Sequence, residues 1–209
     1  MGNSCHRYVP SELIAPHEVR HFLIRCVSHL AGDAGVRQFL DLSGGRHGDH
    51  RAGRDVEQDT HQIAAFFHPD ARTAYPCSDV AATEAVIAGA REVLDFTEPI
   101  AVLMVGVLGA ITETPEEMRR IVGVLMDAVP SGSYLVLSDG ADTGDRNLRE
   151  ISRRHRYHLY TLAEFQSCFA NLEVIEPGQV PINLWRPAPL QLNALVPVYG
   201  SYASVGRKP

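Results

Sequence analysis

A short apolar segment, residues 36–42, ends beside an acidic side chain and leads into a pair of glycines. Apolar residues bounded by glycine are typical of a buried parallel strand, and glycine lets the backbone turn sharply after it. Open α/β sheets bind their ligands at the carboxyl ends of such strands. The residues that could contact a ligand here are Asp41, Ser43, Gly44 and Gly45. An ordinary strand followed by a surface loop would give the same pattern, so both interpretations stand.

The next segment is polar and rich in glycine, and its composition predicts a loop over residues 43–62. Imidazole and carboxylate side chains suit divalent transition metals, and this segment holds several: His47, Asp49, His50 and His61. A metal site also needs ligands in a fixed geometry, which a loop of this kind does not supply by itself. A solvated loop is therefore the simpler interpretation, and a metal-dependent enzyme is a lesser alternative.

Hydrophobic patterns predict the elements that must position these side chains. Apolar residues recur every three or four positions from Val19 to Leu30, which predicts a helix. His21, Arg25 and His29 fall on its other face, which we expect to be exposed. A threonine followed three residues later by glutamate predicts further helices after Thr114 and Thr161.

Strands are predicted from apolar runs between turn-forming residues. They are expected at residues 36–42, 100–108, 134–138, 172–176 and, as extended structure, within 190–205. An acidic loop over residues 139–145 should follow the third of these strands, at the same edge of the sheet as Asp41. Residues 146–158 carry five arginines and two histidines, which favours a solvated basic helix face.

Composition limits the classes of function. The chain has 209 residues, of which 45% are hydrophobic and 21% charged, as is usual for a globular protein. A formal charge of −6 argues against a nucleic-acid or anionic-membrane binder, and no apolar run is long enough to span a bilayer. Four scattered cysteines suggest neither a disulfide framework nor a zinc knuckle, and without a secretory signal a cytoplasmic location is expected. Residues 1–15 should form an N-terminal arm and residues 16–209 a single domain.

Five segments together resemble one actinobacterial family of S-adenosylmethionine-dependent methyltransferases, formerly a domain of unknown function. They are RQFLD (37–41), LDFTEPIAVL (94–103), PSGSYLVLS (130–138), LEVIEPG (172–178) and WRP (185–187). The resemblance runs from about Val19 to Pro187. It implies an α/β fold of the Rossmann-like methyltransferase type, with a mostly parallel sheet flanked by helices and an antiparallel pair near the C-terminus. It also implies S-adenosylmethionine as cofactor and a small molecule as substrate, and a homo-oligomer is compatible with it.

The chain departs from the family pattern at three places, all at the expected cofactor edge. The family typically has glycine where Ser43 stands and commonly has histidine where Gly109 stands. About a strand and a helix are missing after residue 72, which shortens the region of the second and third strands. The acid that would bind the ribose hydroxyls aligns with Cys77, which leaves Asp79 as the local substitute.

Two main hypotheses follow. The chain transfers a methyl group to a small molecule, with Asp41, Ser43, Gly44, Gly45 and Asp79 at the cofactor and no catalytic residue assigned. Alternatively, the fold persists without methyl transfer, as a ligand-binding or partner-binding module or as a cyclase or isomerase.

Overall fold

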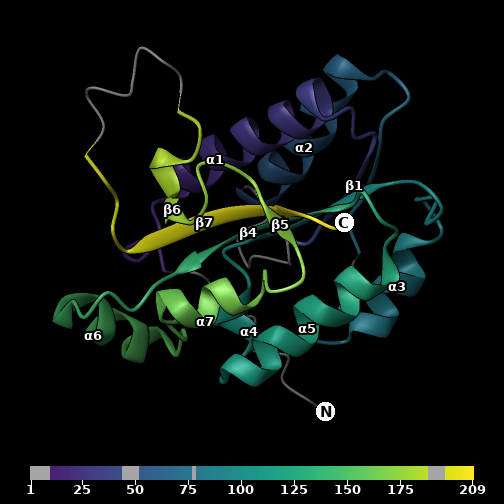
Figure 1. Cartoon of the computed structure of the whole chain (residues 1–209). Helices are drawn as coiled ribbons and strands as arrows, with labels where there is room; N and C mark the ends of the chain where they lie inside the picture. Colours follow the sequence, from purple (N-terminus) through teal and green to yellow (C-terminus); the bar gives the residue numbers. More distant parts are fainter. Residues whose placement is uncertain (1–9, 44–51, 77–78, 188–195) are drawn as a thin grey trace.

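A seven-stranded mixed sheet forms the centre of the protein (Figure 1). The computed structural model describes residues 10–43, 52–76, 79–187 and 196–209. In spatial order the strands are β2 (Arg72–Ala74), β1 (Gln38–Asp41), β3 (Ile100–Val105), β4 (Tyr134–Gly140), β7 (Ser201–Arg207) and β5 (Glu173–Val174), and β6 (Val180–Pro181) also pairs with β7. The first four are parallel, whereas β7 is antiparallel to β4, β5 and β6. The predicted mostly parallel sheet with a C-terminal antiparallel pair is confirmed.

Helices cover both faces of the sheet (Figure 1). On one face lie α1 (Pro16–Ser28), a π-helical turn (His29–Asp33) and α2 (Ala52–Phe67); on the other lie α3 (Thr83–Ala90), α5 (Pro115–Ala128) and α7 (Leu162–Ser167). Successive residues of a strand point to opposite faces, so Phe39 packs in the first core and Leu40 in the second. The short helix α4 (Leu108–Ile111), α6 (Arg146–His155) and a 3-10 turn (Ile182–Leu184) complete the described elements.

The predicted loop over residues 43–62 is wrong for its second half, because α2 begins at Ala52. Polar and glycine-rich composition concealed a helical spacing. Thr60 and Ala64 are fully buried, Ile63 packs against the same core, and the three lie one turn apart on one face of α2. This helix packs on α1 and on β1, so it reaches the end of the strand where the candidate site begins.

The structure also locates the shortened region. β2 is the outermost strand of the described sheet, and the chain passes from it to α3 without another strand among the described residues. Proline has no N–H to donate to a neighbouring strand, so Pro76 predicts an edge strand or an irregular segment before it; the structure has a three-residue edge strand there, β2. On its parallel side the described sheet therefore ends at β2, the strand next to β1.

Three local predictions need correction. Residues 196–200 are not in a strand, and residues 190–195 lie outside the described residues. The strand itself continues to Arg207, after which Lys208 donates hydrogen bonds to the last carbonyls of the α5 region, those of Met126 and Val129 (both 2.8 Å). Arg25 is half-buried rather than exposed, because its guanidinium binds the carbonyls of Trp185 (2.7 Å) and Ile182 (2.8 Å).

The ends of the described chain also pack on this framework. Leu13 and Ile14, in the segment expected to form an arm, are buried in the core beneath α1. Within the described residues, no helix combines the length and the apolar character needed to cross a bilayer.

Candidate functional site

The carboxylate of Asp41 lies at the carboxyl end of β1 and is held from two sides. Its Oδ1 accepts a hydrogen bond from the backbone N–H of Ser43 (2.9 Å), and its Oδ2 accepts one from the hydroxyl of Thr60 (2.7 Å). Asp41 is 3% exposed and Thr60 is fully buried. Because each oxygen of this buried carboxyl group is held by a hydrogen bond, the two bonds fix the position of the chain at the end of β1.

Ser43 connects the same turn to the neighbouring strand. Its hydroxyl accepts a hydrogen bond from the backbone N–H of Val105 (3.1 Å), the last residue of β3. One rung earlier, the N–H of Leu42 donates to the carbonyl of Leu103 (2.9 Å). The serine side chain therefore extends the bonding between the two strands beyond the point where β1 ends. The glycines that follow, Gly44 and Gly45, lie outside the described residues.

A second carboxylate lies two strands away, at the end of β4. Asp139 was expected in a solvated loop, but it belongs to the strand and is 1% exposed. It accepts hydrogen bonds from the hydroxyl of Tyr157 and from the backbone N–H groups of Gly109 (3.1 Å) and Gly140 (2.7 Å). Burial raises the pKa of Asp139 to about 6, although these hydrogen bonds act to lower it.

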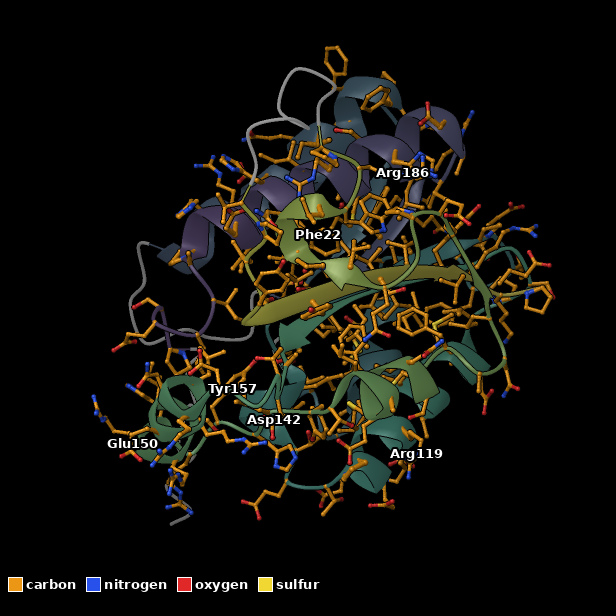
Figure 2. All side chains as sticks on the ribbon, turned by 60° about the vertical axis from the view of Figure 1, so that its left-hand side comes forward. Phe22, Arg119, Asp142, Glu150, Tyr157 and Arg186 are labelled. Atoms are coloured by element: carbon orange, nitrogen blue, oxygen red, sulfur yellow. The ribbon has the colours of Figure 1, made fainter. Side chains whose placement is uncertain are left out.

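Tyr157 was not singled out by the sequence, because its contact with Asp139 spans 18 positions and leaves no local pattern. Figure 2 shows Tyr157 at the same end of the sheet as Asp142 and as Glu150, a residue of α6. Phe22 and Arg186 lie away from it. Its side chain is 2% exposed, and burial raises the pKa of its hydroxyl well above the usual value. The hydroxyl therefore stays protonated and donates to Asp139.

Gly109 explains how the tyrosine fits. A Cβ at this position would lie 2.4 Å from the carbonyl oxygen of His158 and 2.4 Å from the ring of Tyr157. The backbones of Gly109 and His158 lie close enough for a hydrogen bond, which the N–H of His158 donates to the carbonyl of Gly109 (2.7 Å). The histidine that the family resemblance implies at this position would collide with both groups. The segment that carries Tyr157 occupies the space that such a histidine side chain would need at the edge of the sheet.

The remaining candidate residues are not brought together. Asp79 is exposed, and its carboxylate accepts from the backbone N–H of Ala81 (3.0 Å), which shapes the turn before α3. His61 is exposed on α2, whereas His47, Asp49 and His50 lie outside the described residues. In the part of the chain that the structure describes, no three histidine, cysteine or acidic side chains are grouped as metal ligands would be.

A hollow of about 650 Å³ lies at the opposite end of the sheet. Its lining includes Gln38, Arg72, Asp95 and Arg207, which stand at or beside the amino ends of the parallel strands and at the end of β7. The lining contains three arginines and three carboxylates. Because α/β sheets receive ligands at the carboxyl ends of parallel strands, we place the candidate site at Asp41 and Ser43 rather than in this hollow.

The sheet order, the antiparallel β7 and the acid followed by a turn after β1 define a protein of methyltransferase fold. The sequence profile of the S-adenosyl methyltransferase family matches residues 1–79 and 60–209, two segments that together span the sequence. The chain therefore belongs to the S-adenosyl methyltransferase family, and the resemblance found in the sequence is confirmed. No protein of curated function matches the chain.

Solved structures agree with this assignment. A Thermobifida fusca structure, described as that of a candidate methyltransferase, is 31% identical with a TM-score of 0.79, and the match covers 97% of this chain and 84% of the other. A DUF574 family protein from Streptomyces avermitilis is 26% identical with a TM-score of 0.73, covering 95% and 87%. The N-methyltransferase NodS from Bradyrhizobium japonicum, in complex with S-adenosyl-L-homocysteine, is 13% identical with a TM-score of 0.52, covering 96% and 92%, and it supports the fold alone.

Proposed function

We propose that this protein binds S-adenosylmethionine at the carboxyl edge of the sheet and transfers its methyl group to a small molecule. The observation that carries the proposal is the geometry of Asp41, a buried carboxylate at the end of β1 that accepts from the N–H of Ser43 and so shapes the turn leading to Gly44. A strand that ends in such a turn, at the carboxyl edge of a parallel sheet, is where this class of fold receives a nucleotide-like ligand.

The residues of this chain would act by positioning. When bound, S-adenosylmethionine supplies a methyl group activated by its sulfonium, and the protein has to hold an acceptor in line with it. The turn after Asp41 would hold the cofactor, with Gly44 and Gly45 allowing close approach and Asp79 available on the side of β2. We assign no catalytic role to Asp139, because it is 1% exposed and both of its oxygens already accept hydrogen bonds from the protein.

A second candidate function is ligand binding without methyl transfer. The packing around Tyr157 favours this function, since its ring and the carbonyl of His158 fill the edge of the sheet beside Gly109. An acceptor placed over the ends of β3 and β4 would have to compete with that segment. In this case the fold would serve as a binding module, or as an isomerase or cyclase that uses the remaining space.

Calorimetric titration of the purified protein with S-adenosylmethionine and S-adenosylhomocysteine separates these functions. We expect micromolar affinity in the wild type and at least tenfold weaker binding in Asp41→Asn. Asp70→Ala is the matched control, because Asp70 is an exposed acid that pairs with Arg37 at the amino end of the sheet. Its affinity should equal that of the wild type.

Transfer itself is measured as release of S-adenosylhomocysteine in the presence of a panel of small hydroxyl, amine and thiol acceptors. Turnover that depends on Asp41 supports the methyltransferase, whereas tight binding without turnover across the panel supports the binding module. Absence of binding at millimolar cofactor overturns the proposed function. Elemental analysis of the same preparation tests the metal-dependent alternative, which requires a stoichiometric transition metal.

A further inference from the structure

We infer that Thr60 and Ser43 are positioning residues that hold the carboxyl end of β1, from Asp41 to Ser43, ready for the cofactor. Thr60 acts through the carboxylate of Asp41, and Ser43 acts through the backbone of β3. The inference rests on the proposed function and names two side chains that set the shape of the same site. Neither is required to touch the cofactor.

The first anchor comes from α2. The hydroxyl of Thr60 donates to Oδ2 of Asp41 at 2.7 Å, and both side chains are buried. A carboxylate with one oxygen held in this way cannot rotate freely, so its other oxygen stays directed at the N–H of Ser43, 2.9 Å away. Valine has nearly the same shape as threonine but lacks the hydroxyl. With valine at position 60 the carboxylate would lose this restraint while the packing of α2 would be kept.

The second anchor is the hydroxyl of Ser43, which provides a hydrogen-bond acceptor for the N–H at the end of β3. The β1–β3 ladder pairs residues up to Asp41 and Leu103, so the N–H of Val105 lies beyond the last paired rung. A buried N–H without a partner costs free energy, and the hydroxyl of Ser43 accepts from it at 3.1 Å. Ser43 is 5% exposed, so solvent does not provide an easy substitute. Glycine at this position would have no side chain with which to make this bond.

The two anchors meet at one residue. The backbone N–H of Ser43 is bound to Asp41, and its side chain is bound to Val105. The chain therefore leaves the sheet from a residue fixed on both sides, one position before Gly44. A strand end held in place before the ligand arrives loses less entropy on binding, which raises affinity. Serine, where the family resemblance implies glycine, thus links β1 to β3 at the edge of the sheet where we propose that the cofactor binds.

The structure offers a matched control for Ser43. Ser133 is buried as well, with no exposed surface, and its hydroxyl accepts a hydrogen bond from the N–H of Ile100 (3.0 Å), the first residue of β3. The two serines make the same kind of bond to opposite ends of one strand. Ser43→Ala and Ser133→Ala should lower the melting temperature by similar amounts. Only Ser43→Ala should weaken binding of S-adenosylhomocysteine, by tenfold or more in calorimetry.

Thr60 is tested with Thr60→Val and Thr60→Ser. We expect Thr60→Val to weaken S-adenosylhomocysteine binding by tenfold or more, and Thr60→Ser, which keeps the hydroxyl, to bind within threefold of the wild type. Wild-type affinity in Thr60→Val or in Ser43→Ala overturns the inference but not the proposed function. Equal loss of affinity in Ser43→Ala and Ser133→Ala also overturns it, because the effect would then follow stability alone. A wild-type protein that does not bind the cofactor overturns both.

Discussion

Replacement of Gly109 by alanine is the sharpest test of how the edge of the sheet is filled. Gly109 lies in α4, between the end of β3 and the segment that carries Tyr157. The added methyl group would meet the carbonyl oxygen of His158 and the ring of Tyr157, both at 2.4 Å. Real contacts of this kind are about an ångström longer. The oxygen belongs to the backbone of a loop whose neighbouring N–H groups are bonded, that of His158 to Gly109 and that of Tyr160 to Gly140 at the end of β4, so it cannot move without disturbing those bonds.

The magnitude follows from these contacts. Forcing a methyl group into a packed region costs about 1–3 kcal/mol. Displacing the loop would also break the hydrogen bond from the N–H of His158 to the carbonyl of Gly109, which contributes about 0.5–1.5 kcal/mol. We therefore expect Gly109→Ala to lower the free energy of unfolding by about 2–4 kcal/mol. That is a large part of the ~5–15 kcal/mol that stabilises an ordinary domain.

Urea unfolding followed by tryptophan fluorescence is the assay. Trp185 is the only tryptophan in the sequence and is fully buried, so its emission reports loss of the core. Gly123→Ala is the matched control, because Gly123 lies within α5 and a Cβ there would meet no atom within 4 Å. In that variant the free energy of unfolding should rise by about 0.5–1 kcal/mol, since alanine favours the helix more than glycine does. A Gly109→Ala protein within about 0.5 kcal/mol of the wild type would refute the packing described here.

Three further predictions concern single side chains. Tyr157→Phe removes a donor that favours the ionised form of Asp139, so the pKa of that carboxyl should rise above about 6 in a carbon-13 NMR titration; an unchanged or lower value would contradict the bond. Because the folded pKa is already raised, this group contributes stability that is fully present below about pH 4 and lost as the pH rises through about 6. Thr161→Ala removes the capping box of α7 and should cost about 1 kcal/mol in urea unfolding, whereas Thr161→Ser should cost much less. Cys26 is buried and its pKa is raised well above the usual value, so it should resist iodoacetamide at pH 8 until urea unfolds the protein; rapid labelling of the native state, seen by mass spectrometry, would be the contrary result.

The strands were predictable from the sequence because each buried strand is a short run of consecutive apolar residues. Ile100 to Val105 is a continuous apolar run, and every residue of it is buried. The caps of α5 and α7 were predictable for the same reason, since Thr114 and Thr161 bond to groups three residues away. The family resemblance was likewise carried by short segments around these strands. Such features need no knowledge of distant residues.

The candidate site was predictable only in part, because its bonds join distant parts of the chain. The position of Asp41 at a strand end followed from the sequence, but its partner Thr60 lay in a segment interpreted as a loop. The spacing of Thr60, Ile63 and Ala64 was the signal for a helix, but the polar, glycine-rich composition of the segment led to its interpretation as a loop. Ser43 was expected to contact the cofactor, and its bond to Val105, 62 positions away, had no pattern in the sequence. That it contacts the cofactor stays a prediction.

The place of β7 in the sheet has a consequence for how the protein is made. This strand lies between β4 and β5 and also pairs with β6, yet its residues, Ser201–Arg207, come after all three in the chain. During synthesis the free edge of β4 has to wait for a partner until residue 207 has left the ribosome. Unpaired strand edges recruit other chains, and long-range pairing of this kind is slow. The nascent protein is therefore prone to aggregate in the interval between the emergence of β4 and the emergence of β7.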